Sequence, residues 1–282
     1  MKGLILAGGA GTRLRPITHT SAKQLVPVAN KPILFYGLEH MVAAGITEIG
    51  MIVGDTRNEI MTAVGDGSRW GIDVTYIPQD SPLGLAHCVL IAREFLGDEH
   101  FVMYLGDNLL EQGLREFVDA FATDTSNAAA QILLHQVPDP QRFGVAELNA
   151  DGEVIRLVEK PVDPPSDLAL VGVYLFDPRI HDAVRAIEPS PRGELEITDV
   201  NLVYLRAGRL NVRVMGRGMA WLDTGTHESL LQASNFIEAI ENRQGLMVGS
   251  IEEVAFRMGF IDAEGLLRAA APFRKNDYGR YL

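Results

Sequence analysis

The chain has 282 residues, of which 47% are hydrophobic and 22% are charged. This composition is typical of a folded globular protein and excludes disorder as a description of the whole chain. The formal net charge is −12, from 25 Lys and Arg against 37 Asp and Glu, which argues against general binding to nucleic acid or anionic membranes. No apolar run reaches the ~18 residues of a membrane span. A single cysteine, Cys88, leaves no internal disulfide and fits a reducing compartment, so we expect a soluble cytoplasmic protein.

The first part of the chain alternates between predicted strands and predicted helices. Apolar runs predict strands over residues 2–7, 49–53, 72–77 and 101–105, and helical spacing predicts helices over residues 33–44 and 83–96. Thr56 and Glu59 have the spacing of a capping box ahead of a further helix. This alternation predicts an α/β fold with a Rossmann-like, mixed but mostly parallel sheet, flanked by helices on both faces.

The pattern changes in the second part of the chain. Residues 144–148 and 154–158 flank Asn149-Ala150-Asp151-Gly152, which indicates a small β-hairpin insertion rather than a crossover. Further strands are predicted over residues 128–137, 168–176 and 210–215, with helices near 180–187 and 195–207. From residue 226 onward the pattern is helical, over 229–243, after a second capping box formed by Ser250 and Glu253, and over 264–271. We therefore expect an α/β core over residues 1–225 and a C-terminal helical segment over 226–282.

A glycine-rich loop, residues 8–11, follows the first predicted strand. Glycines allow the backbone to approach a phosphate chain closely and to present its N–H groups to the oxygens. Four cations lie close behind the loop in this acidic chain: Arg13, Arg15, Lys23 and Lys31. The loop is neither a Walker A motif nor a dinucleotide fingerprint, because Leu14 stands where the third glycine belongs and no Gly-Lys-Ser/Thr follows. These residues fit either a site for a small phosphorylated ligand or a solvated basic turn.

Two aspartates are candidates for a metal site. Asp107 follows the apolar run 101–105, at the edge where open α/β sheets bind ligands, and Asp223 lies in the later turn 221–225. Mg²⁺ suits such oxygens, since it takes one or two carboxylates together with substrate phosphates. For either aspartate alone, a turn or capping role is the commoner explanation. The seven histidines are scattered, which argues against a zinc site.

Beyond these local patterns, the chain resembles the sugar-phosphate nucleotidylyltransferases over essentially its whole length. The segments that carry the resemblance are Leu6-Ala-Gly-Gly-Ala-Gly-Thr-Arg-Leu-Arg-Pro16, Lys23-Gln-Leu-Val-Pro27, Tyr104-Leu-Gly-Asp-Asn108, Glu159-Lys-Pro161, Arg192-Gly-Glu-Leu-Glu-Ile-Thr198 and Trp221-Leu-Asp-Thr-Gly225. The resemblance implies an Mg²⁺-dependent transferase of deoxysugar biosynthesis, such as the rhamnose route, that makes dTDP-glucose and pyrophosphate from dTTP and glucose 1-phosphate. It also implies a homotetramer, with neither nucleic acid nor membrane as a partner.

The resemblance assigns roles to individual residues. It implies catalytic roles for Arg13, Lys23, Lys160 and Arg192, and metal ligation by Asp107 and Asp223. It implies nucleotide binding by Leu6, Gly8, Gly11, Thr12, Gln24, Gln79, Gly84 and Asn108. It implies sugar contacts from Gly144, Glu159, Leu170 and Tyr174. The nucleotide-binding part is then expected at about residues 1–110 and the sugar-phosphate-binding part at about 128–225.

The implied chemistry requires no general base and no covalent intermediate. A sugar phosphate has a second pKa near ~6, so its oxygen is already largely anionic at neutral pH. The expected step is in-line attack on the α-phosphorus of the nucleotide, for which the enzyme supplies positioning and positive charge. Two alternatives stay open: a uridylyltransferase of the same family, and a non-catalytic sugar-nucleotide sensor, which the presence of both aspartates opposes.

Overall fold

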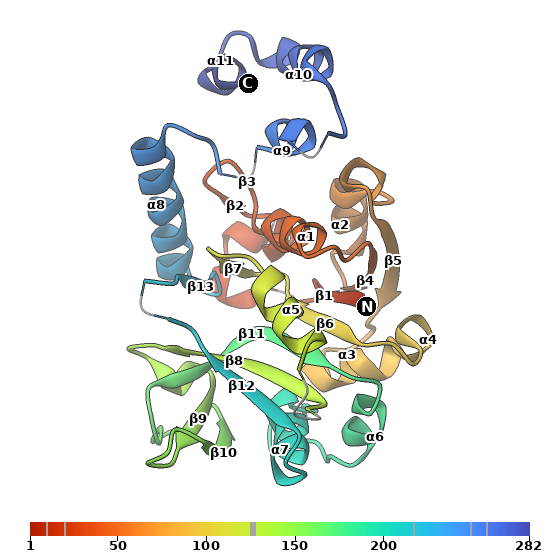
Figure 1. The fold of residues 1–282 in the computed structure, drawn as a ribbon, viewed down its shortest axis with the longest axis vertical. Helices are drawn as coiled ribbons and strands as arrows, with labels where there is room; N and C mark the ends of the chain where they lie inside the picture. Colours follow the sequence, from red (N-terminus) through yellow and green to blue (C-terminus); the bar gives the residue numbers. More distant parts are fainter. Residues whose placement is uncertain (10, 20, 125–127, 217, 249, 258) are drawn as a thin grey trace.

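The fold is built on one mixed β-sheet that carries helices on both faces (Figure 1). The computed structural model describes residues 1–282 apart from 10, 20, 125–127, 217, 249 and 258. Within the described part of the chain the strands of this sheet are β1 (Lys2–Leu6), β4 (Glu48–Val53), β5 (Asp73–Pro78), β6 (Phe101–Leu105), β8 (Ala130–Gln136), β9 (Gly144–Leu148), β10 (Val154–Glu159), β11 (Leu168–Phe176) and β12 (Leu210–Val214). Their order is β10-β9-β11-β6-β1-β4-β5, with β8 paired to both β11 and β12.

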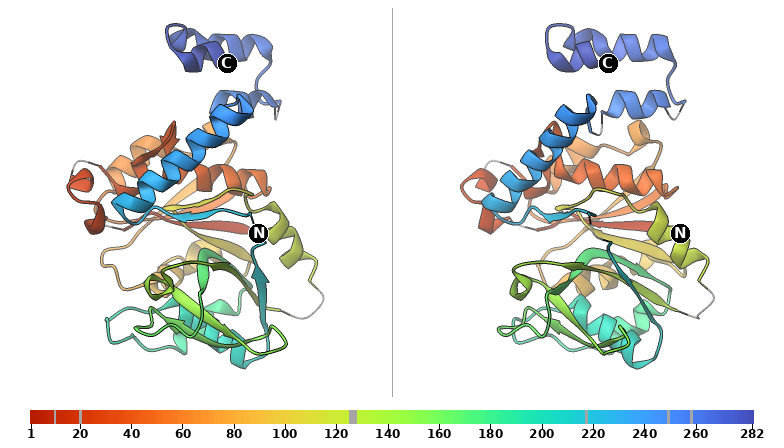
Figure 2. Two further views of the ribbon diagram at one scale, coloured as in Figure 1. Left: turned by 90° about the vertical axis from the view of Figure 1, so that its left-hand side faces the viewer. Right: turned by 60° about the vertical axis from the view of Figure 1, so that its left-hand side comes forward.

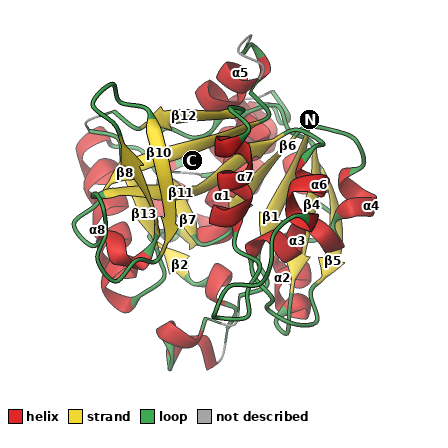
Figure 3. Ribbon diagram, turned by 90° about the horizontal axis from the view of Figure 1, so that it is seen from below, coloured by secondary structure: helices red, strands yellow, loops and turns green. Residues whose placement is uncertain are grey.

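Parallel pairing dominates the part of the sheet formed by the first half of the chain. β1 lies between β4 and β6 and is parallel to both, and β5 continues the sheet in parallel from β4. β11 runs antiparallel to β6 and to β8, and β9 and β10 form an antiparallel hairpin. Viewed from below, the strands spread from β5 on one side to β10 on the other (Figure 3). The predicted mostly parallel mixed sheet with a hairpin insertion is confirmed.

Helices cover both faces because successive residues of a strand point to opposite sides of the sheet. In β1, Ile5 belongs to one apolar core and Leu4 and Leu6 to the other. The first core includes side chains of α1 (Ile33–Ala43), α2 (Arg57–Val64) and α5 (Arg115–Ala122). The second includes side chains of α3 (Leu85–Ile91), α4 (Arg93–Leu96), α6 (Ile180–Arg185) and α7 (Ile197–Arg206). Burial on both faces explains why these strands read as unbroken apolar runs in the sequence.

The C-terminal part of the chain is helical, as predicted. It comprises α8 (His227–Gln244), α9 (Ile251–Arg257), α10 (Ala263–Ala270) and α11 (Asp277–Tyr281). α8 begins at a capping box between Thr226 and Ser229 and packs on the core through Ala233 and Ile237. Figures 1 and 2 show α10 and α11 beyond α9, at the end of the molecule farthest from the β9–β10 hairpin. Among the described residues, no helix is long and apolar enough to cross a membrane.

Two small sheets lie outside the central one. β7 (Asn108–Leu110) pairs antiparallel with β13 (Trp221–Asp223), which sets Asp223 directly opposite Asn108. β2 (Pro27–Val28) pairs with β3 (Lys31–Pro32). Because Asn108 follows Asp107, the first of these pairings brings the two predicted metal ligands to one place.

Some local predictions were wrong. The helix expected over residues 83–96 begins only at Leu85 and is interrupted at Ala92 between α3 and α4. Gly84 has a φ of +103°, outside the helical range, which accounts for the late start. Thr56 and Glu59 do not form a capping box: the Glu59 carboxylate instead accepts a hydrogen bond from the backbone N–H of Ala22 at 2.6 Å. Glu59 therefore links α2 to the loop that contains Ala22, and it does not cap the helix.

At the second predicted capping box only one of its two hydrogen bonds forms. The backbone N–H of Glu253 donates to Ser250 Oγ at 3.4 Å, whereas the Glu253 carboxylate accepts from the Tyr281 hydroxyl. Pattern reading also left out α5, α11 and the strands of the two small sheets. Strands of two or three residues are too short to show a period, so this omission is expected.

Candidate active site

Two adjoining pockets lie at the carboxyl ends of the parallel strands. The first has a volume of about 320 Å³ and is lined by Leu6, Ile52, Gln79 and Leu105, which lie at or next to the carboxyl ends of β1, β4, β5 and β6. The second has a volume of about 240 Å³. Residues common to both walls are Arg13, Leu85, Leu105, Asp107 and Glu194. This position, outside the carboxyl ends of strands in an open α/β sheet, is where ligands bind in such folds.

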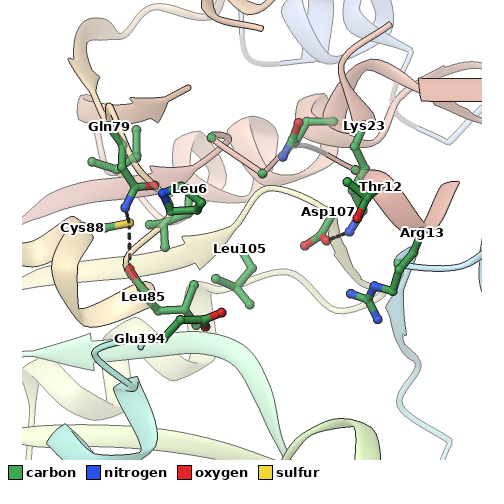
Figure 4. Close-up of a pocket in the computed structure, with 18 residues that line it drawn as sticks. Leu6, Thr12, Arg13, Lys23, Gln79, Leu85, Cys88, Leu105, Asp107 and Glu194 are labelled. Atoms are coloured by element: carbon green, nitrogen blue, oxygen red, sulfur yellow. Dashed lines mark hydrogen bonds and ion pairs between the residues drawn. The ribbon is translucent and has the colours of Figure 1, made fainter. Parts of the chain in front are cut away.

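Every residue to which the resemblance assigns a role lines one of these two pockets. Of the four cations that follow the glycine-rich loop, however, Arg15 and Lys31 line neither pocket, and Lys31 instead forms an ion pair with Glu39. The first pocket is lined by Leu6, Gly8, Gly11, Thr12, Arg13, Lys23, Gln24, Gln79, Gly84 and Asp107 (Figure 4). The second is lined by Arg13, Asp107, Asn108, Gly144, Glu159, Lys160, Leu170, Tyr174, Arg192 and Asp223. The structure therefore separates the residues expected to bind nucleotide from those expected to bind sugar phosphate, with one exception: Asn108, predicted to bind nucleotide, lies on the sugar-phosphate side.

One wall of the first pocket is formed by the backbone of the glycine-rich loop, where Gly8, Gly9 and Gly11 line the pocket. Gly11 has a φ of 62° and precedes a 3-10 turn over Thr12–Leu14 that carries Arg13. A Cβ at Gly11 would lie 2.8 Å from Lys23 Cβ, so any larger residue would displace that lysine. Thr18 Oγ1 donates to the Gly11 carbonyl at 2.8 Å and fixes the loop. The glycine therefore serves both the turn and the close approach of a cation.

Asp107 is held in its ionised form at the boundary between the pockets. Its Oδ2 forms an ion pair with Lys23 Nζ, and its Oδ1 accepts from Asn108 Nδ2 at 2.9 Å. Lys23 itself is only 8% exposed. Burial opposes ionisation of Asp107, but the Lys23 ammonium and the Asn108 amide outweigh it and lower the pKa of the carboxyl. A lysine buried this far is stable only with such a partner.

Asp223 lies beside Asp107. Burial raises the pKa of Asp223, and the negative charge of Asp107 raises it further. The backbone N–H and hydroxyl of Thr224 both donate to the Asp107 carbonyl, at 3.1 and 2.8 Å, and fix the two segments together. Arg142 Nη2 lies 3.5 Å from Asp223 Oδ2.

These two carboxylates fit a divalent cation. They are largely buried, they repel each other, and each offers the hard oxygen ligands that Mg²⁺ prefers. Within the described part of the chain there is no group of three or more His, Cys, Asp or Glu side chains arranged to hold a metal. A metal bound here would thus depend on waters and on ligand phosphates for its remaining positions, which matches the usual coordination of Mg²⁺.

The second pocket is built from charged side chains. Glu159 Oε2 accepts from Thr198 Oγ1 at 2.6 Å, and Lys160 Nζ lies 3.4 Å from Glu159 Oε1. Lys160 has a φ of 41°, a left-handed conformation that non-glycine residues rarely adopt and that is found preferentially at functional sites. Its backbone N–H donates to the Phe143 carbonyl at 3.0 Å, which holds the strained residue in place.

Arg192 is oriented by acidic neighbours. Its Nη2 donates to Glu194 at 2.7 Å and to Glu196 at 3.0 Å, and it lies 4.0 Å from Glu159. Glu196 is buried and also accepts from Ser190 Oγ at 2.8 Å. A guanidinium held in this way keeps unused N–H donors in a fixed orientation toward the pocket.

Three residues of the site were not found from the sequence. Glu194 and Glu196 lie within the segment that begins at Arg192, but their interaction with that arginine is a matter of tertiary geometry. Arg142 belongs to no motif: it follows β8 in a 3-10 turn and bridges Asp139, at 2.6 Å, and Asp223. Its only signal in the sequence is a cation three residues after an aspartate, which is common on protein surfaces.

A glycine-rich loop, a buried lysine beside two carboxylates, and a second pocket with two more cations offer positive charge and backbone N–H groups in both pockets, which suits phosphorylated ligands. The family model described as Nucleotidyl transferase matches residues 2–240. The chain belongs to this nucleotidyl transferase family.

Comparison with known proteins places the chain among sugar-nucleotide enzymes. It is 54% identical over 268 residues to a glucose-1-phosphate thymidylyltransferase from Streptomyces griseus, covering 94% of this chain and 73% of the relative. It is 48% identical over 284 residues to the enzyme of the same name from Xanthomonas campestris pv. campestris, covering 100% of this chain and 95% of the relative. A solved structure of UDP-glucose pyrophosphorylase with UDP-glucose aligns with a TM-score of 0.72 and 25% identity, covering 84% of this chain and 98% of that one.

Proposed function

We propose that this enzyme transfers a deoxythymidylyl group from dTTP to glucose 1-phosphate, giving dTDP-glucose and pyrophosphate. The observation that carries the proposal is the shared wall between the two pockets, where Arg13 and Asp107 line both. Such a wall lets one phosphate ester reach another without leaving the site. The names of the relatives from Streptomyces griseus and Xanthomonas campestris support the same reaction.

The nucleotide occupies the first pocket in this proposal. Backbone N–H groups of the glycine-rich loop and the side chains of Arg13 and Lys23 bind the triphosphate, because both cations line this pocket. Gln79, which lies at the end of the pocket away from Arg13 and Lys23 (Figure 4), contacts the base together with Gly84, which lines the same pocket. Leu6, Gly8, Thr12 and Gln24 complete the walls.

The sugar phosphate occupies the second pocket. Lys160 and Arg192 bind its phosphate as cations, since their side chains line the pocket and reach Glu159 and Glu196 in the absence of ligand. Glu159 accepts hydrogen bonds from sugar hydroxyls, while Gly144, Leu170 and Tyr174 shape the space around the ring. Asn108, also on this wall, is fixed by Trp221, whose Nε1 donates to its side-chain oxygen at 2.6 Å.

Asp107 and Asp223 are the proposed ligands of Mg²⁺. When bound, the ion would neutralise phosphate charge and draw electron density from the α-phosphorus. Lys23 supplies positive charge from the protein itself, because it forms an ion pair with Asp107 and lines the first pocket. Arg142 does the same for Asp223 on the side of the second pocket. These cations offset part of the repulsion between the two acids, although burial and the charge of Asp107 still raise the pKa of Asp223.

The residues of the chain then act by positioning. Lys160 and Arg192 hold the sugar phosphate so that its oxygen faces the α-phosphorus, and Arg13 and Lys23 hold the triphosphate in line with it. The oxygen forms a bond to the α-phosphorus as the bond to pyrophosphate breaks, and the cations stabilise the charge that accumulates on pyrophosphate. Because the attacking oxygen is already anionic, no side chain takes a proton.

Three further features belong to the proposal. The nucleotide part covers about residues 1–110 and the sugar-phosphate part about 128–225, within a core of 1–225 that precedes the helical segment 226–282. We also propose a cytoplasmic homotetramer that serves deoxysugar biosynthesis. The apolar side chains exposed on and around α9 and α10, such as Phe256 at 41%, Phe260 at 57% and Leu267 at 68%, support an interface on that segment.

Pyrophosphate release tests the proposal. Purified protein with Mg²⁺, dTTP and glucose 1-phosphate is expected to release pyrophosphate and to form dTDP-glucose in equal amounts. A matrix of dTTP and UTP against several hexose 1-phosphates would separate the thymidylyltransferase from a uridylyltransferase, which the UDP-glucose pyrophosphorylase structure keeps as the second candidate. Binding of dTTP without any release, in every combination, would instead favour the sugar-nucleotide sensor.

A further inference from the structure

Gln79 lines the first pocket from the end of β5, the strand at one edge of the sheet. It follows β5 directly, and its backbone N–H donates to the Val53 carbonyl at 2.8 Å, which fixes its place at the carboxyl edge of the sheet. Its side chain points toward Cys88 on the first turn of α3 (Figure 4), and His87 on the same turn also contacts it. The backbone position is thus rigid, and only the orientation of the amide is left to side-chain contacts.

Two acceptors on α3 bind the nitrogen of that amide. Gln79 Nε2 lies 3.1 Å from His87 Nδ1 and 3.3 Å from Cys88 Sγ. An amide nitrogen can only donate, so Nδ1 of His87 accepts and the ring carries its proton on Nε2. The Cys88 thiol donates to the Gly84 carbonyl, with a sulfur-to-oxygen separation of 3.7 Å, and so leaves its lone pairs toward Gln79.

Cys88 can accept a hydrogen bond from Gln79 while its own thiol stays protonated. The side chain is buried, and burial raises the pKa of the thiol to about 12. The neutral thiol keeps the proton that it shares with Gly84, so the sulfur acts as an acceptor toward Gln79 throughout the physiological range. As sulfur is a weak acceptor, His87 makes the stronger of the two contacts.

With both N–H groups engaged, the carbonyl oxygen of Gln79 faces the pocket. Oε1 has no hydrogen-bond partner among the residues that the structure describes. Oε1 lies near Gly8, and a Cβ built on that glycine would be 3.4 Å from it. The pocket therefore meets an acceptor at this point and no donor from Gln79 (Figure 4).

We propose that His87 and Cys88 are positioning residues that hold the Gln79 amide with its oxygen toward the nucleobase, and that this orientation selects bases with a ring N–H donor. The inference rests on the proposed function, because it takes the first pocket to be the nucleotide site. Thymine and uracil carry such a donor at N3. Cytosine has an acceptor at N3, which would oppose Oε1 and leave both groups without a partner. Gln79 accordingly excludes dCTP but treats dTTP and UTP alike, so any preference between those two arises from other contacts.

Nucleotide binding without sugar phosphate tests this directly, since no turnover occurs. Titration calorimetry with dTTP, UTP and dCTP in Mg²⁺ is expected to show dTTP binding at least ~100-fold tighter than dCTP in the unmodified protein, as unpaired polar groups are strongly rejected. His87→Leu removes the stronger acceptor and should lower the dTTP to dCTP ratio by about 10-fold. His87→Gln, which offers a carbonyl oxygen, should restore the ratio, and Cys88→Ala should lower it by only about 3-fold.

The control is His100→Leu, because His100 is exposed and lines neither pocket. It is expected to leave the ratio unchanged. The inference is overturned if His87→Leu binds dTTP and dCTP in the ratio of the unmodified protein, or if His87→Gln behaves like His87→Leu. Loss of the proposed function is a separate result: a protein that binds dTTP selectively yet never releases pyrophosphate would refute the reaction and leave the base selection standing. Failure to bind any of the three nucleotides would overturn both.

Discussion

The two pockets of the site are made in different ways. The first is formed largely by backbone: a glycine-rich loop, the ends of four parallel strands and a few fixed side chains. The second is formed by side chains whose charges balance one another, with Lys160, Arg192, Glu159 and Glu196 in mutual contact. Backbone N–H groups suit the triphosphate that we propose for the first pocket, whereas the side chains of the second pocket can be exchanged by mutation to suit a different sugar. This difference predicts distinct kinetic consequences for substitutions on the two sides.

Asp107→Asn should have the largest effect, because Asp107 lines both pockets. Loss of its charge removes a proposed metal ligand and leaves Lys23 without its ion pair. We expect kcat/KM to fall about 10³-fold for both substrates together. Steady-state kinetics at saturating Mg²⁺ measure this fall. Asp182→Asn is the matched control, since Asp182 is exposed and forms an ion pair with Arg185, away from both pockets. Near-normal activity of Asp107→Asn would remove Asp107 from the reaction.

Arg192→Ala should affect the second pocket alone. The substitution removes a cation that is proposed to bind the sugar phosphate, so kcat/KM for glucose 1-phosphate should fall about 10²-fold. The dissociation constant of dTTP should stay within about 2-fold, because Arg192 does not line the first pocket. Arg185→Ala provides the control, as that arginine is 63% exposed. An equal loss in dTTP binding would show that the two pockets are not separable.

Gly11→Ala should affect the first pocket alone. The new Cβ would lie 2.8 Å from Lys23 Cβ in a left-handed conformation, so we expect the KM for dTTP to rise about 10-fold, from strain of about 1–2 kcal/mol. Gly45→Ala is a matched control: Gly45 has a similar φ of +78°, but a Cβ there meets nothing within 4 Å. Both variants should lose thermal stability from the left-handed conformation, Gly11→Ala somewhat more because of the contact with Lys23, and only Gly11→Ala should change the KM. A similar change in Gly45→Ala would indicate a general effect of stability.

Glu196→Gln should have the smallest effect. Glutamine keeps the shape of the side chain and one acceptor for Arg192, but loses the charge that orients the guanidinium. The KM for glucose 1-phosphate should rise about 3-fold to 5-fold with kcat nearly unchanged, as fits a positioning role. A large fall in kcat instead would place Glu196 in direct contact with the reacting groups.

Patterns in the sequence predicted the fold better than they predicted the site. Strands such as β1 and β6 are buried on both faces, so they stand out as unbroken apolar runs, and the turn at Asn149–Gly152 marks the hairpin. The break at Ala92 between α3 and α4 has no such signal. Glu59 shows the limit of local motifs, because its spacing with Thr56 indicates a cap while its carboxylate bonds a distant loop.

The site depends on contacts that no local pattern contains. Asp107 and Asp223 meet because β7 pairs with β13, and these strands have three residues each. The prediction that the two acids share one metal ion came from the resemblance to a known family and not from any local pattern. Arg142 was missed for the same reason, since its link to Asp223 is purely tertiary. Residues at strand ends could be anticipated, whereas partners supplied by other segments could not.

The stereochemistry at the α-phosphorus tests the central claim, which is that the two pockets face each other across one wall and allow direct in-line transfer. The enzyme would be given a single diastereomer of dTTP with sulfur on the α-phosphorus, and the configuration of the dTDP-glucose analogue would be determined by ³¹P NMR. A single in-line displacement predicts inversion. Retention would contradict it, because it would require a covalent intermediate and a nucleophile that the proposed site does not use.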